Sequence, residues 1–243
     1  PMERQQQLVE KYGKLAENAK TDERSAYILE HAEEYPDDIL KMYYKGSQNY
    51  DYVYNYFTHK DDYDTMSFTA EELNSETVPP LYMDDVRWGY EKINQNYIKT
   101  NGCLPVALTM AALYLNRDSE TDPVKISRIA EENYEAPIFG GVDTANISDL
   151  SGRIGLAAEE YQFNNENPPC EEQFLKDIID SGNVCLAGII DDVKGGHAVI
   201  VSAVENGMVR INDPASREIT ETPVPFEEFQ GELYYVWELS SAK

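Results

Sequence analysis

The stretch Asn101-Gly102-Cys103-Leu104-Pro105-Val106-Ala107-Leu108-Thr109-Met110 decides the fold. A polar turn ends at Cys103, and the residues from Pro105 to Leu115 include no charge and no glycine. Proline is favoured in the first turn of a helix, and a helix that is apolar on all sides is a buried one. We therefore predict a buried helix with Cys103 at or just before its N-terminus.

The position of Cys103 suggests a reactive thiol. Unpaired N–H groups and the helix dipole at a helix N-terminus favour a thiolate and lower the thiol pKa. A free cysteine is more often a small buried apolar residue, so this stretch alone leaves both interpretations open. Cys185 lies in an apolar run and is predicted to be core, whereas Cys170 follows two prolines and is predicted to lie in a loop.

Composition limits the classes of function. The 243 residues include 45 acidic and 20 basic side chains, for a formal net charge of −25. This charge argues against binding nucleic acid or an anionic membrane surface. No apolar run approaches the ~20 residues of a membrane span, so no membrane insertion is expected. No signal peptide is present, and a start at Pro1 rather than Met is compatible with removal of an N-terminal segment. The oligomeric state is not specified by these features.

The chain is predicted to form two domains. Residues 1–65 show apolar side chains at helical spacing and are predicted to be a helical N-terminal domain. Within them, residues 50–57 alternate like a strand but also fit one helix face, and the neighbouring helices favour a helix. Residues 66–80, rich in Ser, Thr, Glu and Pro, are predicted to be a linker, and residues 81–243 a second domain.

The second domain is predicted to be α+β. Helical patterns continue to about Ser181, and β-rich runs follow at 184–190, 197–204, 208–212 and 233–239. Asn206-Gly207 between the second and third runs is a strong hairpin signal. Helices followed by an antiparallel sheet make an α+β domain.

The hairpin brings candidate catalytic residues together. A thiol nucleophile needs a base, and the base needs a group that orients it. His197 would be the base for Cys103. If the two-residue loop is followed by regular pairing, the numbers of any two residues opposite one another on the two strands sum to 413. Asn212 then lies on the same face of the sheet as His197. A bulge or a longer loop brings Asp213 to that face instead, so both orienting residues remain candidates.

Four motifs resemble one family. Trp88-Gly89, Gly102-Cys103-Leu104-Pro105, Gly195-Gly196-His197 and Asp213-Pro214 are similar to motifs of the bacterial cysteine peptidase-like domains related to the bacteriocin-processing, double-glycine leader peptidases. The resemblance covers roughly residues 80–243. It implies a papain-like fold with Cys103 as nucleophile, His197 as base and Asp213 as orienting acid.

The same resemblance extends to the N-terminal helices, which are similar to extensions on secreted members of the group. It therefore implies export from a Gram-positive bacterium. No metal or organic cofactor is implied.

Two features depart from the family pattern. Leu104 stands where the family usually has glycine, and its larger side chain would narrow the site. The oxyanion hole of such enzymes pairs a backbone N–H with a glutamine side chain. Gln95 is the nearest glutamine before Cys103, although its spacing is longer than in the leader peptidases, and Asn94, Asn96 and Asn101 are alternatives.

These observations predict a cysteine peptidase or amidase-type hydrolase that acts on an extracellular peptide-like substrate through a thioester. The alternative is a catalytically inactive peptidase-like module that binds a protein or a cell-wall ligand, with Leu104 as the sign of lost activity. Transfer of the acyl group to an amine rather than water is a third possibility.

Overall fold

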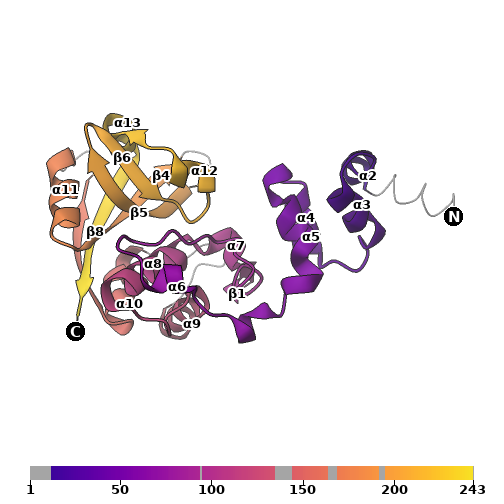
Figure 1. Ribbon diagram of the computed structural model, residues 1–243, viewed down its shortest axis with the longest axis horizontal. Coiled ribbons are helices and arrows are strands. Elements are labelled where there is room, and N and C mark those ends of the chain that lie inside the picture. The colour runs from indigo at the N-terminus through magenta and orange to yellow at the C-terminus, as the bar shows by residue number, and fades with distance from the viewer. Residues whose placement is uncertain (1–11, 94, 135–143, 164–168, 192–194, 243) are drawn as a thin grey trace. The chain divides into compact units, whose positions relative to one another are not determined.

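The computed structural model describes residues 12–93, 95–134, 144–163, 169–191 and 195–242 (Figure 1). The chain divides into two compact units, residues 1–64 and 65–243.

The N-terminal unit is helical. Its helices follow capping signals in the sequence: Asp22 accepts a hydrogen bond from the Ser25 N–H at 3.1 Å, and Pro36 precedes a helix that opens with two aspartates. Residues 50–57 are helical, as predicted. The elements are α2 (Gly13–Asn18), α3 (Glu23–Glu30), α4 (Asp37–Tyr43), η1 (Ser47–Asn49), α5 (Tyr50–His59) and η2 (Asp62–Thr65).

Stacked and hydrogen-bonded tyrosines pack these helices against one another. The rings of Tyr43 and Tyr50 stack with centroids 4.2 Å apart. The Asn18 side chain donates to both hydroxyls, at 2.7 and 2.6 Å, and the Ser25 hydroxyl lies 2.7 Å from that of Tyr43. Because both hydroxyls are satisfied within the unit, these two tyrosines are packing elements.

The segment predicted as a linker, residues 66–80, belongs to the second unit. It contains a short helix, α6 (Ala70–Leu73), which begins with a capping box formed by Thr69 and Glu72. The Arg87 guanidinium donates to both oxygens of the Glu72 carboxylate, at 2.9 and 2.7 Å. The Ser, Thr and Glu content that suggested a linker therefore encodes a helix cap and an ion pair.

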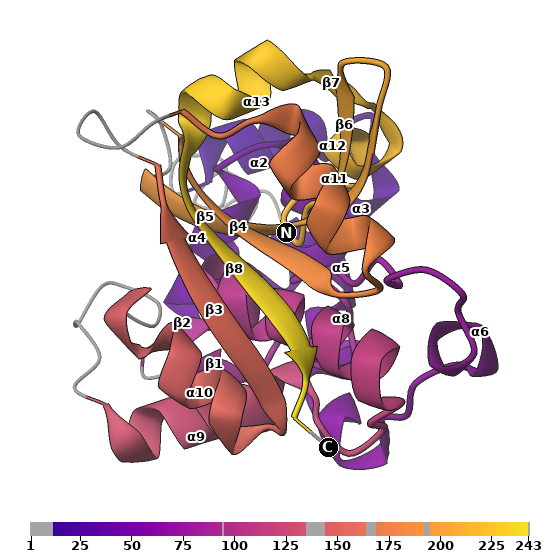
Figure 2. The same cartoon turned by 90° about the vertical axis from the view of Figure 1, so that its left-hand side faces the viewer.

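A six-stranded antiparallel sheet forms one part of the second unit, with strand order β3-β8-β4-β5-β6-β7. Figure 2 shows β3 beside β8. The four predicted strands are confirmed, but β3 was not predicted, because its Ala and Glu residues favour helices and it lies at the sheet edge. The strands are β3 (Leu156–Gln162), β4 (Val184–Asp191), β5 (Gly195–Glu205), β6 (Met208–Asn212), β7 (Val224–Pro225) and β8 (Leu233–Ser241). A separate pair is β1 (Lys92–Ile93) and β2 (Asn96–Tyr97).

Helix α8 (Cys103–Asn116) is the predicted buried helix. Every side chain from Leu104 to Leu113 is buried, and the helix lies against β4, β5 and β8. Other sheet residues share a second apolar core with α11 and α13. The remaining helices are α7 (Ile98–Asn101), α9 (Pro123–Asn133), η3 (Thr144–Asn146), α10 (Ile147–Arg153), α11 (Glu172–Asp180), α12 (Arg217–Glu221) and α13 (Phe226–Glu232). The expected α+β class, a buried helix carrying a cysteine on an antiparallel sheet after a small all-α unit, is confirmed.

Candidate functional site

Cys103 is the first residue of α8, as the sequence predicts. Gly102 joins α7 to α8, and a Cβ at this position would lie 2.6 Å from the Ile98 carbonyl oxygen, so the tight junction requires glycine. Cys103 is partly exposed, and its sulfur accepts hydrogen bonds from the backbone N–H groups of Leu104 and Ala198. The thiol is therefore held by the start of a helix and by strand β5.

His197 lies between Cys103 and Asp213. Its Nε2 is 2.7 Å from Asp213 Oδ1, and the side chains of the two residues are 9% and 3% exposed. The imidazole is also hydrogen-bonded to the Cys103 thiol. A thiol, an imidazole and a carboxylate thus form one continuous chain.

A β-bulge selects Asp213 over Asn212. The loop has two residues, Asn206 and Gly207, both with positive φ, and the first pairs of the hairpin sum to 413. The register shifts between Val201 and Ala203, after which the pairs sum to 412. The extra residue, Ser202, therefore brings Asp213 to the face of His197 and turns Asn212 to the other face.

Asp213 and Asn212 have separate partners. Asp213 Oδ1 also accepts the Ala215 N–H at 2.7 Å, so Asp213 is both a turn residue and the partner of His197. The Asn212 side chain donates to the Val78 carbonyl oxygen at 2.8 Å. Asn212 thus holds a neighbouring segment of the chain and not the imidazole.

The electrostatics favour a thiolate–imidazolium pair. Burial raises the pKa of the Cys103 thiol, but the hydrogen bond and charge of His197, with the two backbone N–H groups, outweigh it and lower this pKa below its ordinary value. Burial lowers the pKa of His197, but hydrogen bonds to Asp213 and Cys103 and their charges outweigh it and raise this pKa to about 10. Both shifts therefore favour a proton on the imidazole over a proton on the thiol.

The other two cysteines differ from Cys103. Cys170 lies in a loop, as predicted, but its side chain is buried in the core with that of Cys185. Burial raises the pKa of Cys170 to about 12 and also raises that of Cys185. Only Cys103 combines exposure with a lowered pKa.

Gln95 is exposed in the turn between β1 and β2, and among the described residues no hydrogen bond joins it to Cys103, His197 or Asp213. Of the alternatives, Asn94 lies outside the described residues.

Leu104, the residue expected to narrow the site, is only 5% exposed. Its side chain is part of the core around α8, while its backbone N–H reaches the sulfur.

Sequence reasoning missed the backbone donors and the residues around Asp213. The N–H groups of Leu104 and Ala198 carry no side-chain signal. Thr220, whose hydroxyl accepts the Asp213 N–H at 2.9 Å, follows the aspartate by seven residues on the short helix α12, which was not predicted.

In the described ranges, no group of His, Cys, Asp and Glu side chains could hold a metal ion. No helix in the described part of the chain is long and apolar enough to cross a membrane.

No family model matches the sequence, and no curated protein is significantly similar to it. Several solved structures of peptidase domains are similar to this chain. The peptidase domain of Streptococcus ComA, a bifunctional ABC transporter involved in quorum sensing, has a TM-score of 0.45 and 18% identity over 58% of this chain and 93% of its own.

Two further structures give similar values. A C39-like peptidase from Bacillus anthracis has a TM-score of 0.46 and 13% identity over 73% of this chain and 100% of its own. A double-glycine motif protease from an AMS/PCAT transporter, in complex with its leader peptide, has a TM-score of 0.37 and 17% identity over 68% of this chain and 95% of its own.

Proposed function

We propose that this chain is a cysteine peptidase or amidase-type hydrolase. One observation carries the proposal: the imidazole of His197 is hydrogen-bonded to the thiol of Cys103, a partly exposed residue, on one side and to the buried Asp213 carboxylate on the other. A nucleophile, a base and an orienting acid in this order are the parts that acyl transfer requires.

The reaction would proceed in two steps. The Cys103 thiolate attacks the carbonyl carbon of an amide and forms a C–S bond. His197 then gives its proton to the departing amine as the C–N bond breaks, which leaves a thioester. In the second step water attacks the carbonyl carbon of the thioester while His197 accepts a proton from that water. The C–S bond breaks, the carboxylic acid departs, and the Cys103 thiolate and the protonated His197 are restored.

The start of α8 would stabilise the oxyanion of each step. The first N–H groups of a helix have no partner within it, so the Cys103 N–H is a natural donor to a developing negative charge. Gln95 stays the side-chain candidate from sequence, although its position in an exposed turn does not favour it.

The proposed substrate is a peptide or peptide-like amide outside the cell. A net charge of −25 disfavours nucleic acid, and the motif resemblance associates such N-terminal helices with exported proteins. Localisation at the surface of, or outside, a Gram-positive bacterium is part of this proposal.

Alkylation by iodoacetamide across pH tests the proposal, with Cys170 and Cys185 of the same chain as internal controls. We expect Cys103 to be alkylated well below the ordinary thiol pKa of ~8.5, and the two buried cysteines to stay unlabelled in the folded protein. Peptide-library digestion followed by mass spectrometry should then give products that the Cys103→Ala variant does not.

The rival functions predict other results. Alkylation of Cys103 with an ordinary thiol profile and no products would contradict the hydrolase and favour a binding module. Products extended by an added amine would instead identify acyl transfer to amines.

A further inference from the structure

Residues 78–85, which we call the strap, contact both sides of the candidate site. On the sheet side, the Val78 carbonyl accepts the Asn212 side chain at 2.8 Å, and the Met83 N–H donates to the Pro214 carbonyl at 2.8 Å. These contacts flank Asp213 in sequence. The strap therefore runs along the turn that carries the partner of His197.

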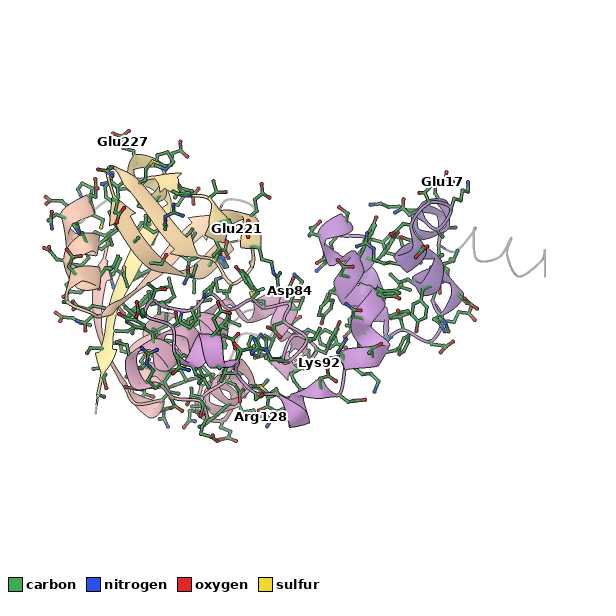
Figure 3. The ribbon with its side chains drawn as sticks, viewed as in Figure 1. Glu17, Asp84, Lys92, Arg128, Glu221 and Glu227 are labelled. Carbon is green, nitrogen blue, oxygen red and sulfur yellow. The ribbon has the colours of Figure 1, made fainter. Side chains whose placement is uncertain are left out.

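Asp84 of the strap pairs with cations from two different elements. Arg217 Nη1 lies 2.8 Å from Oδ1 and 2.9 Å from Oδ2 of Asp84, and Lys99 Nζ lies 3.7 Å from Oδ2 (Figure 3, where Asp84 is labelled). Arg217 opens α12 directly after the Asp213 turn, and its guanidinium also stacks 4.1 Å from the ring of Tyr82. Lys99 belongs to α7, which leads through the tight Gly102 junction into Cys103.

This arrangement joins the two halves of the candidate site. Asp213 and His197 are fixed to one another by the β5–β6 register, and Cys103 is fixed to α7 and α8. The hydrogen bond between Cys103 and His197 depends on how these two assemblies are placed. Asp84 is the carboxylate that both assemblies share, through Arg217 and Lys99.

We infer that Asp84 is a positioning residue, which holds the helix that presents Cys103 against the turn that presents Asp213. The inference rests on the proposed function and adds a residue that touches neither the substrate nor the reacting atoms. An error of ~1 Å between reacting groups costs about 100-fold in rate, so a partly exposed ion pair matters here through geometry more than through global stability.

The test is the pH profile of Cys103 alkylation by iodoacetamide in Asp84→Asn. We expect the pH of half-maximal alkylation to rise and the rate at pH 6.5 to fall about 3- to 10-fold, because a loosened contact with His197 weakens the stabilisation of the thiolate. Arg217→Met, which removes one of the two cations of Asp84, should change the profile in the same direction. The double variant should change it no more than Asp84→Asn alone, because the contact with Arg217 is already broken there. Asp84→Glu, which keeps the charge, should recover part of the rate.

A matched control is present in the chain. Asp149 and Arg153 on α10 form an exposed pair at 2.8 Å, and Asp149→Asn should leave the alkylation profile unchanged. Circular dichroism and thermal unfolding establish that each variant is folded. A folded Asp84→Asn protein with the wild-type profile would overturn the inference.

The two proposals fail separately. If wild-type Cys103 reacts as a thiolate at low pH and Asp84→Asn does the same, only the positioning role falls. If wild-type Cys103 has an ordinary thiol profile, the proposed function falls and the positioning role with it.

Discussion

Replacing Asp213 by asparagine should release the proton of His197 at a much lower pH. The pKa of His197 is raised from its ordinary ~6.5 to about 10, which corresponds to roughly 5 kcal/mol in favour of the imidazolium at ~1.4 kcal/mol per pH unit. The largest contribution that raises this pKa is the hydrogen bond to Asp213. The hydrogen bond to Cys103, the charge of Cys103 and the charge of Asp213 supply the rest. If the Asp213 carboxylate supplies about half of this stabilisation, Asp213→Asn removes about 2–3 kcal/mol of it. The titration midpoint of His197 then falls by about 2 pH units.

Side-chain NMR measures this change directly. The chain has three histidines, so His31→Gln and His59→Gln variants identify the signal of His197. We expect a midpoint near 10 in the wild type and near 8 in Asp213→Asn, with slower Cys103 alkylation at pH 6.5.

Asn212→Leu is the matched control. It leaves the carbonyl of the half-buried Val78 without the Asn212 donor and should lower stability by about 1 kcal/mol, but the midpoint of His197 should stay in place. A wild-type midpoint near 6.5, or a midpoint that moves in Asn212→Leu and not in Asp213→Asn, would refute the assignment of Asp213 as the partner of His197.

Two further predictions concern pH and the oxyanion hole. In the unfolded chain both Cys103 and His197 have lost their protons above about pH 8.5. In the folded chain the pKa of Cys103 is lowered and that of His197 is raised to about 10, so His197 keeps a proton that the unfolded state has released. The pair's contribution to the free energy of unfolding should therefore fall as the pH rises from about 8.5 to about 10. Urea unfolding of wild type against Cys103→Ala/His197→Ala measures this difference, and a difference that stays constant from about pH 8.5 to about 10 would contradict it. Gln95→Ala should change kcat/KM for a cleaved peptide by less than about 3-fold, since Gln95 is exposed in a turn; a loss of about 100-fold or more would place it in the oxyanion hole.

The sequence contains the local part of the site. The proline two residues after Cys103 and the uncharged run behind it were sufficient to predict where α8 begins and that it is buried. Asn206-Gly207 predicted the hairpin, because both residues tolerate the positive φ that its turn needs. These features depend on a few neighbouring residues, so they are visible without the rest of the chain.

Features of the site that depend on residues far apart in the sequence could not be predicted in the same way. Asn212 and Asp213 could not be ranked from pairing alone, because the bulge at Ser202 depends on how the whole sheet packs and has no residue signature. The expectation of a linker at 66–80 failed because the ion pair between Glu72 and Arg87 joins residues fifteen positions apart. Asp84 was overlooked for the same reason, since Arg217 lies far along the chain.

The unpaired residue in β5, Ser202, determines which side chain faces His197. With Ser202 present, the imidazole faces the Asp213 carboxylate. With one residue fewer in that strand, the alternation of faces would place the neutral amide of Asn212 there instead. Insertion or deletion of a single codon, without any substitution at Asn212 or Asp213, would therefore exchange the chemical character of the group behind the histidine.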